Sequence, residues 1–225
     1  MIVRLIAQTF VWFGPMGILL FTAAGTFAWP GAWTYLVLMV TLSFTLGIDL
    51  ARNDPELLRE RMGSPVHRNQ PAADKMLLIA LLFFMFAWFV LMGLDAKRFA
   101  WSSVPALMQV LGALITLWSI WFCYRTMREN SFAAPVIKLQ QERGQRVIST
   151  GPYAFVRHPM YFGAAFYFIG AALLLGSWLG VIFAFILIGL LCIRIPIEEK
   201  VLRAGLVGYD EYAAHVRYRL IRHVW

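Results

Sequence analysis

Residues 149–161, STGPYAFVRHPMY, concentrate polar and aromatic side chains between two apolar regions. Gly151-Pro152 is a turn signal, because glycine tolerates backbone angles that other residues avoid and proline fixes its own. Pro159 stands where a helix can begin without losing a hydrogen bond. A ring nitrogen of His158, together with the free N–H groups of that first turn, suits a carboxylate ligand. These residues predict a polar, preorganised loop at a membrane surface.

The tripeptide Arg157-His158-Pro159 alone has a second interpretation as an ordinary membrane entry. In that case the basic residue and the imidazole ring lie at the interface and the proline starts a helix. The flanking Tyr153 and Tyr161 add hydrogen-bonding aromatic rings to the same few positions. This density of polar groups favours a binding loop.

Arg194 lies at the end of an apolar run, LLCIRIP, where a charge is costly unless it reaches water or a partner. One interpretation is that its side chain extends to the interface and pairs with Glu198. The other is an anion-binding residue at the membrane boundary. A guanidinium suits that role because it binds a carboxylate through two parallel hydrogen bonds and stays charged at cellular pH.

Glu198 and Glu199 are adjacent on the same predicted helix, so their side chains point about 100° apart and should not face one site as an acid–base pair. Glu198 shares a face with Arg194 and is the better candidate for binding ribose hydroxyls or an amino group. Glu199 is expected to pair with Arg203 as a routine surface contact. Pro196 interrupts the helix hydrogen bonds near these residues, which leaves their relative placement open.

Composition indicates the class of protein. Of the 225 residues, 60% are hydrophobic and 14% are charged, whereas soluble domains carry about 25% charged residues. We therefore expect an all-α integral membrane protein folded as one bundle, because every apolar helix needs the others as neighbours. Cys123 and Cys192 fall inside apolar runs and are expected to be buried free thiols. The four histidines show no metal-ligand spacing, so no metal site is predicted.

Six apolar runs predict about six transmembrane helices, since about 20 residues of helix cross a hydrocarbon core of about 30 Å. The runs cover residues 5–28, 33–50, 75–94, 101–124, 160–175 and 178–193. Gly14-Pro15 should kink the first of them. The last two form a predicted helical hairpin around Gly176-Ser177, and each is short for a full crossing.

Two long polar connectors and a polar tail accompany these runs. Residues 51–75 are interpreted as an interfacial connector, with a helix start at Asp54-Pro55, rather than as part of a site. Residues 125–157 form the longest polar segment, and a connector of this length is commonly functional. Four aromatic residues of the tail are expected to be membrane-interface anchors: Tyr209, Tyr212, Tyr218 and Trp225.

Basic residues are distributed unevenly along the predicted bundle. Of the 20 Lys and Arg residues, all except Lys97 and Arg98 fall in the N-terminus, the two long connectors and the tail. Positive charge favours the cytoplasmic side, so both termini and the candidate residues above are expected there. This distribution accounts for the net charge of +8, and we do not expect nucleic-acid binding. The compact chain and its lack of a recognisable targeting signal predict a bacterial inner-membrane protein.

The elements GPY and RHPMY, followed by Arg194, Glu198, Glu199 and a closing GYDEY, together resemble the isoprenylcysteine carboxyl methyltransferase family. This family lies within a wider group of membrane methyltransferases that includes the phospholipid N-methyltransferases. The resemblance covers residues 130–225, the expected catalytic region; residues 1–129 are expected to be membrane-spanning helices with a connector. It implies methyl transfer from S-adenosyl-L-methionine, bound at the cytoplasmic side between the long loop and the final helices.

The resemblance also implies roles for single residues. The implied cofactor-binding residues are Gln140, Gln145, Arg146, Val147, Ile148, Tyr153, His158, Pro159, Met160, Tyr161 and Glu198. Arg194 matches the family's substrate-positioning arginine and is the candidate catalytic and substrate-binding residue. The loop glutamine could also align at Gln141 or Lys138, and the choice between Glu198 and Glu199 stays open.

The implied acceptor is the carboxylate of an isoprenylated cysteine or a similar lipid-linked acid, so a lipid or isoprenoid partner is expected. A carboxylate is already ionised and needs no general base, whereas a phospholipid amine would need one. Arg194 favours the anionic acceptor. Two alternatives from other classes are a non-enzymatic membrane sensor or channel and a membrane reductase with a nicotinamide cofactor. Polar residues gathered in one loop argue against a channel, whose polar groups line several spans.

Overall fold

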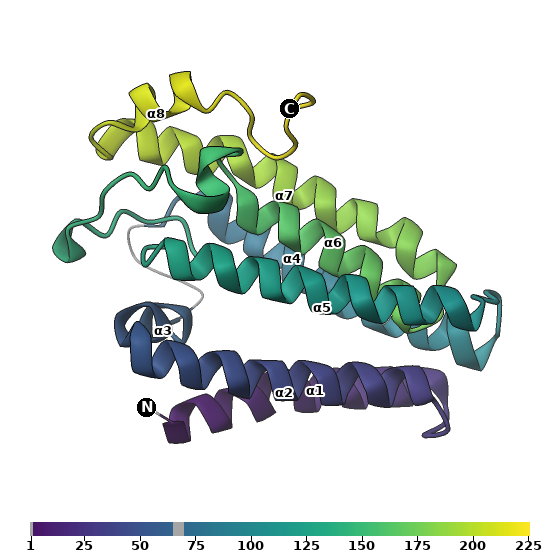
Figure 1. Cartoon of the computed structure of the whole chain (residues 1–225). Helices are drawn as coiled ribbons and strands as arrows, with labels where there is room; N and C mark the ends of the chain where they lie inside the picture. Colours follow the sequence, from purple (N-terminus) through teal and green to yellow (C-terminus); the bar gives the residue numbers. More distant parts are fainter. Residues whose placement is uncertain (1, 65–69) are drawn as a thin grey trace.

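The structure, a computed structural model, describes residues 2–64 and 70–225. In these ranges the regular elements are helices, and the long ones lie side by side in one bundle (Figure 1). Five of them are long and apolar enough to cross a membrane: α1 (Ile2–Ala24), α2 (Pro30–Asn53), α4 (Ala72–Gly93), α5 (Ala106–Glu129) and α7 (Trp178–Gly205). A further apolar helix, α6 (Pro159–Leu174), has 16 residues. The predicted all-α integral membrane fold with about six spans is confirmed.

Shorter elements gather at one end of the bundle, on the left in Figure 1, where α1 also begins. They are α3 (Pro55–Arg61), the 3₁₀ turns η2 (Gln141–Arg143) and η3 (Gly151–Ala154), and α8 (Tyr209–His215). The opposite end carries the π-helical turn η1 (Leu94–Arg98), which continues α4. Lys97 and Arg98, the two basic residues predicted for the other side of the membrane, lie in this turn. Arg68, counted on the basic side, lies outside the described residues.

α7 is longer than the sequence predicts. The expected helix ends near Ile193, whereas α7 runs for 28 residues and includes Pro196. A proline inside a membrane helix is tolerated where neighbouring elements hold both of its sides. Here Glu198 and Glu199, beyond the proline, bind residues of α6 and of the loop before it. The two arms of the predicted hairpin are therefore unequal in length.

Small residues bring α5 and α6 into close backbone contact. A Cβ atom on Gly112 of α5 would lie 2.4 Å from the backbone nitrogen of Leu174 in α6. A Cβ atom on Gly170 of α6 would lie 2.8 Å from the backbone nitrogen of Thr116 in α5. Such close approach stabilises helix pairs in membranes. α5 therefore fixes the position of α6, which begins with the HPMY part of the sequence motif.

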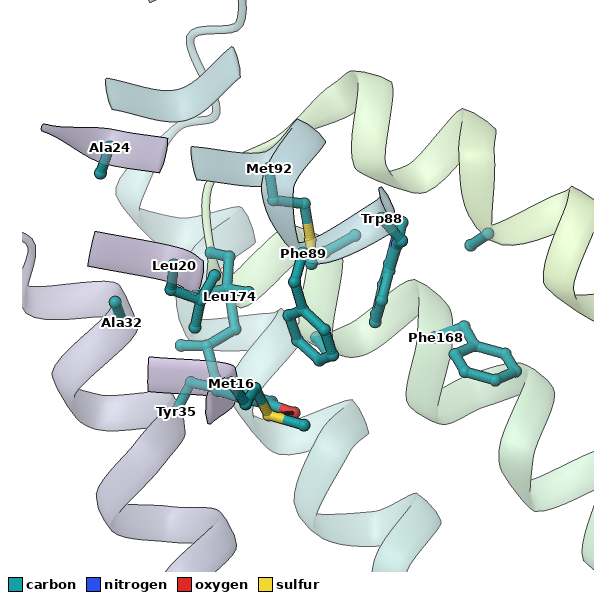
Figure 2. Close-up of a cluster of buried hydrophobic side chains, with 14 of the residues drawn as sticks. Met16, Leu20, Ala24, Ala32, Tyr35, Trp88, Phe89, Met92, Phe168 and Leu174 are labelled. Carbon is teal, nitrogen blue, oxygen red and sulfur yellow. Dashed lines mark hydrogen bonds between the residues drawn. The ribbon is translucent and has the colours of Figure 1, made fainter. Parts of the chain in front are cut away.

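The bundle core surrounds α4 and includes residues of α1, α2 and α6 (Figure 2). Trp88 and Phe89 of α4 and Tyr35 of α2 are fully buried there. The Trp88 indole N–H donates to the Gly180 carbonyl of α7 over 2.8 Å, which satisfies its one polar atom. This packing fixes α4 and α7 relative to each other.

The turn between α6 and α7 follows the prediction. Gly176 has a φ of 80°, in the left-handed region that favours glycine. Ser177 caps α7, because its hydroxyl accepts from the Gly180 N–H over 2.8 Å. The same hydroxyl donates to the buried carboxylate of Asp95 in η1. The hairpin thus sets the orientation of α6 and α7, whose other ends carry the candidate residues.

Candidate functional site

A cavity of about 530 Å³ lies at the end of the bundle that carries α3, η3 and α8. Its volume falls within the range of about 300–1,000 Å³ that is common for small-molecule sites. All of the predicted site residues except Gln140 line it: Gln145, Arg146, Val147, Ile148, Tyr153, His158, Pro159, Met160, Tyr161, Arg194 and Glu198. The fold therefore brings together residues that are separated by long stretches of sequence.

The cavity extends from the polar loops into the apolar bundle. Side chains from five helices form its apolar walls: Met39, Leu78, Leu81, Ile120, Ala164, Phe168 and Leu191. Tyr167 of α6 also lines this part, and its hydroxyl lies 2.5 Å from that of the buried Tyr35. A ligand with a polar head and a hydrocarbon chain matches these two surroundings. The first half of the chain thus contributes walls to the same cavity.

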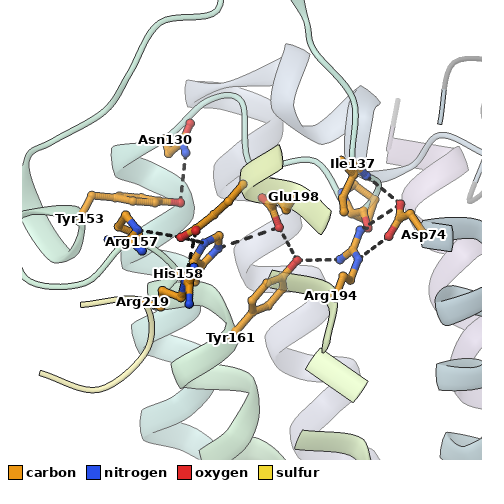
Figure 3. Close-up of polar contacts among 12 residues, drawn as sticks. Asp74, Asn130, Ile137, Tyr153, Arg157, His158, Tyr161, Arg194, Glu198 and Arg219 are labelled. Atoms are coloured by element: carbon orange, nitrogen blue, oxygen red, sulfur yellow. Dashed lines mark hydrogen bonds and ion pairs between the residues drawn. The ribbon is translucent and has the colours of Figure 1, made fainter. Parts of the chain in front are cut away.

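Arg194 is buried and has partners for each of its guanidinium nitrogens (Figure 3). Nε donates to Asp74 Oδ1 over 2.6 Å, and Nη2 donates to the Pro135 carbonyl over 2.9 Å. Nη1 donates over 2.9 Å to the hydroxyl of Tyr161, which donates in turn to Glu198 Oε2 over 2.5 Å. The interpretation of a direct Arg194–Glu198 pair is therefore wrong. Tyr161 bridges the two, and Asp74 of α4 is the carboxylate partner of the arginine.

Glu199 is buried at the centre of a second ionic cluster. Oε1 accepts from Arg157 Nε over 2.7 Å and lies 3.3 Å from His158 Nε2. Oε2 accepts from Arg219 Nε over 3.1 Å. The predicted surface pair of Glu199 with Arg203 is wrong, because Glu199 faces the motif loop. The turn of about 100° between adjacent helix positions places Glu198 on the cavity and Glu199 against the loop.

The C-terminal tail is attached to the loop at Arg157 and His158. The backbone N–H groups of these two residues donate to the carbonyls of Tyr218 and Arg219, over 2.9 and 2.8 Å. Arg157 Nη1 also donates to the Val216 carbonyl over 2.8 Å. Arg157 is buried, so it joins the loop, the tail and α7 instead of facing lipid headgroups.

Tyr153, Tyr209 and Tyr212 are buried and line the polar part of the cavity. The Tyr212 hydroxyl donates to the Tyr153 carbonyl over 2.8 Å, and Asn130 Nδ2 donates to the Tyr153 hydroxyl over 3.0 Å. Burial raises the pKa of all three phenols, which therefore stay neutral at physiological pH. The prediction that Tyr209 and Tyr212 are membrane-interface anchors is wrong, because α8 packs against α7 and buries them.

Gln140 is buried inside the long polar connector and shapes its fold. Its side chain donates to the Phe132 carbonyl over 2.8 Å, and its backbone N–H donates to Gln145 Oε1 over 2.7 Å. Of the two alternative positions for the loop glutamine, Lys138 lines the cavity and Gln141 does not.

Asp74, like Arg61, is not among the predicted site residues. It is fully buried, and its Oδ2 accepts from Gln70 Nε2 over 2.7 Å and from the Ile137 N–H over 3.0 Å. A carboxylate at the start of an apolar helix is costly without a partner. The position of Asp74 therefore indicated that it has a buried partner. The interpretation of residues 51–75 as a connector outside the site is wrong for Arg61, which lines the cavity, and for Asp74, which pairs with the cavity residue Arg194.

The polar end of the cavity has a definite chemical character. Glu198 presents a carboxylate beside the rings of Tyr153 and Tyr161, which suits a ligand with positive charge or hydroxyl groups. The apolar walls suit a hydrocarbon chain. The arrangement favours a reaction between a polar small molecule and an amphiphile at the membrane boundary.

Two comparisons with known proteins agree with this arrangement. The family profile described as phospholipid methyltransferase matches residues 107–205. The protein-S-isoprenylcysteine O-methyltransferase of Saccharomyces cerevisiae is 35% identical to this chain over 111 residues. That alignment covers 48% of this chain and 46% of the yeast protein, so the match spans about half the length of the relative. Part of the chain is therefore similar to phospholipid methyltransferases over residues 107–205, and part of it is similar to an isoprenylcysteine methyltransferase.

Proposed function

We propose that this protein is an S-adenosyl-L-methionine-dependent membrane methyltransferase whose acceptor is the carboxylate of an isoprenylated cysteine or a similar lipid-linked acid. One observation carries the proposal: a single cavity joins the RHPMY residues to apolar walls inside the bundle. A methyl donor and a lipid-linked acceptor need a shared space, because reacting atoms must approach to about 3–3.5 Å. The distribution of Lys and Arg supports a site on the cytoplasmic side of the membrane.

The residues at the polar end of the cavity fit S-adenosylmethionine. Glu198 offers a carboxylate for its ammonium group or ribose hydroxyls, and the rings of Tyr153 and Tyr161 suit its positive charge. Val147 and Ile148 offer apolar contacts for a flat base. When bound, this cofactor supplies a methyl group activated by a sulfonium.

For an acid acceptor, the protein contributes orientation and the exclusion of water. A carboxylate is ionised at neutral pH, so the site needs no general base. Apolar side chains such as Leu78, Leu81 and Leu191 would hold the hydrocarbon chain and fix the position of the acid at the polar end. Removing water from the carboxylate there increases its reactivity.

An amine acceptor, as in phospholipid N-methylation, is the second candidate. The matching family profile favours it, and so does the engagement of Arg194 by Asp74, which weakens the case that this arginine selects an anion. An amine must lose a proton before it attacks. Glu198 is the cavity carboxylate in a position to accept that proton.

Binding of S-adenosylhomocysteine to the detergent-purified protein tests the cofactor assignment. We expect micromolar binding by the wild type that is lost or strongly weakened in Glu198→Ala and His158→Ala. Lys200→Ala is the matched control, because Lys200 is exposed on the same helix as Glu198 and does not line the cavity. A well-folded wild-type protein that binds a nicotinamide dinucleotide and no S-adenosylhomocysteine contradicts the proposal.

Transfer of a labelled methyl group separates the two acceptors. The purified protein is reconstituted in bilayers that contain either a prenylcysteine acid or phosphatidylethanolamine. We expect transfer to the acid. Steady transfer to the amine lipid, with none to the acid, selects the second candidate.

A further inference from the structure

Arg61, the last residue of α3, lines the cavity and is partly buried. Its hydrogen bond within the described residues runs from Nη1 to the Ala133 carbonyl over 2.9 Å. None of the ion pairs among those residues includes it. Residues 1 and 65–69 contain neither Asp nor Glu. The part of the chain that the structure describes therefore gives Arg61 no carboxylate partner, and the remaining residues have none to offer.

The other cationic side chains that line the cavity differ from Arg61 in this respect. Three of them have a carboxylate oxygen within 2.7 Å: Arg157 (Glu199), Lys138 (Glu60) and Arg194 (Asp74). Arg146 is exposed to solvent, where water stabilises its charge. Arg61 thus combines partial burial, a position on the cavity and the absence of a described counter-ion.

The surroundings of Arg61 make its charge costly. Burial lowers the pKa of Arg61, and the nearby Cys123 and Tyr153 carry neutral groups at physiological pH. A cation held among apolar and neutral groups has an unfavourable free energy until an anion approaches. Arginine stays charged in proteins, so it does not relieve this cost by losing its proton. A bound anion would relieve it.

Arg194 has little capacity for that role. Its Nε and Nη2 face the Asp74 carboxylate, and its Nη1 faces Tyr161. A ligand carboxylate could form two parallel hydrogen bonds with Arg194 only by displacing Asp74. Within the described part of the chain, Arg61 has four N–H groups left, because an arginine carries five donors and its hydrogen bond to Ala133 uses one.

We propose that Arg61 is the anion-binding residue of this cavity and that its free N–H groups bind a carboxylate or phosphate of a ligand. This inference rests on the proposed function. The oxyanion has two possible sources: the amino-acid carboxylate of the methyl donor, or the carboxylate or phosphate of the lipid acceptor. A guanidinium binds either through paired charge-assisted hydrogen bonds.

The test uses the full-length protein with Arg61→Gln, Arg61→Lys and, as matched control, Arg59→Gln. Arg59 is exposed on the same helix, so its replacement removes the same charge without reaching the cavity. The probes are S-adenosylhomocysteine, and 5′-methylthioadenosine, which lacks the amino-acid part. The acceptor KM is measured in parallel with the acceptor that the wild type methylates.

If Arg61 binds the donor, Arg61→Gln weakens the binding of S-adenosylhomocysteine by about tenfold to a hundredfold and leaves the affinity for methylthioadenosine unchanged. If it binds the acceptor, the acceptor KM rises by a similar factor and both nucleosides bind as before. Arg61→Lys keeps the charge and retains part of the effect, and it provides the same readouts should the glutamine variant fold poorly.

Unchanged affinities and an unchanged KM in a folded Arg61 variant overturn the inference while the proposed function stands. A wild type that binds no S-adenosylhomocysteine removes the proposed function first, so the two failures are distinct. An equal loss in Arg59→Gln assigns the effect to the general charge of α3 and also overturns the inference.

Discussion

Arg194 Nε lies 2.6 Å from Asp74 Oδ1, although the two residues are 120 positions apart. Both side chains are buried, so this ion pair ties the start of α4 to α7 at the cavity. The arginine that the sequence singles out as an anion-binding residue already has an internal anion. Its position, and through Tyr161 that of Glu198, depends on a residue outside the recognised motif.

Asp74→Asn should therefore destabilise the protein and weaken ligand binding together. Breaking one side of a buried ion pair leaves an uncompensated charge and costs about 3–5 kcal/mol. The free guanidinium of Arg194 should then shift away from Tyr161 and disturb Glu198. Thermal unfolding in detergent and S-adenosylhomocysteine binding measure the two effects.

The double variant Asp74→Asn with Arg194→Gln provides the control for this prediction. Removing both charges should recover part of the stability lost in either single variant, because no unpaired charge remains. Losses that simply add in the double variant would show that the two side chains are not coupled.

Glu198 and Glu199 should respond differently to the same substitution. Glu199→Gln removes a buried anion shared by Arg157, His158 and Arg219, so it should lower thermal stability strongly. Glu198→Gln keeps a partner for the Tyr161 hydroxyl and should leave stability nearly unchanged while weakening S-adenosylhomocysteine binding. Unfolding curves and binding curves of the two variants are compared directly. The reverse pattern would exchange the roles of the two carboxylates.

Local sequence patterns were sufficient to predict most of the fold. Long apolar runs indicate the membrane helices because a helix in lipid must be apolar over most of its length. The turn at Gly176-Ser177 was predictable from residue types alone. The length of α7 was not, because the helix beyond Pro196 is held by contacts of Glu198 and Glu199 with distant residues.

The sequence predicted most residues that line the candidate site, but not the partners of its charged side chains. The residues around RHPMY line the cavity as expected, because they are close in sequence and their turn is built from local signals. The predicted ion-pair partners of Arg194 and Glu199 were wrong. Helix spacing indicates only partners about one turn away on the same helix, whereas the actual partners come from other segments. Arg61 lines the cavity and Asp74 pairs with Arg194, and both come from segments distant from the motif, so no local spacing could indicate which residues they meet.

High pH should destabilise the cavity end of the protein. Burial raises the pKa of Tyr153, Tyr209 and Tyr212 above the ordinary value of about 10. Below about pH 10 these phenols are protonated in both the folded and the unfolded chain, so they add no pH dependence to the free energy of unfolding. As pH rises from about 10 through the folded-state pKa values, the unfolded chain loses protons first, so the free energy of unfolding falls.

Tyr209→Phe gives a sharp test of this pH dependence. The Tyr209 hydroxyl is buried and has no hydrogen-bond partner among the described residues, so its removal should cost little stability at neutral pH. The variant should also lose less stability than the wild type above about pH 10. Thermal unfolding across the alkaline range measures both effects. An unchanged alkaline profile would mean that Tyr209 does not contribute to it.

Gly112→Ala should separate α5 from α6 and destabilise the bundle. The new Cβ would meet the backbone nitrogen of Leu174 at 2.4 Å, and a backbone atom cannot move aside as a flexible side chain can. Overpacking of this kind costs about 1–3 kcal/mol. Because α6 begins at Pro159 and carries Tyr161, the shift should also weaken S-adenosylhomocysteine binding at the far end of the helix.

Gly189→Ala is the matched control for this prediction. A Cβ atom on Gly189 of α7 meets nothing within 4 Å, and alanine is favoured over glycine in a helix by about 1 kcal/mol. This variant should therefore be as stable as the wild type or slightly more stable, and should bind S-adenosylhomocysteine normally. If Gly112→Ala were equally harmless, the close contact of α5 and α6 would not be what positions the motif. The position of the motif would then depend on the ion pairs of Glu199 and on the tail.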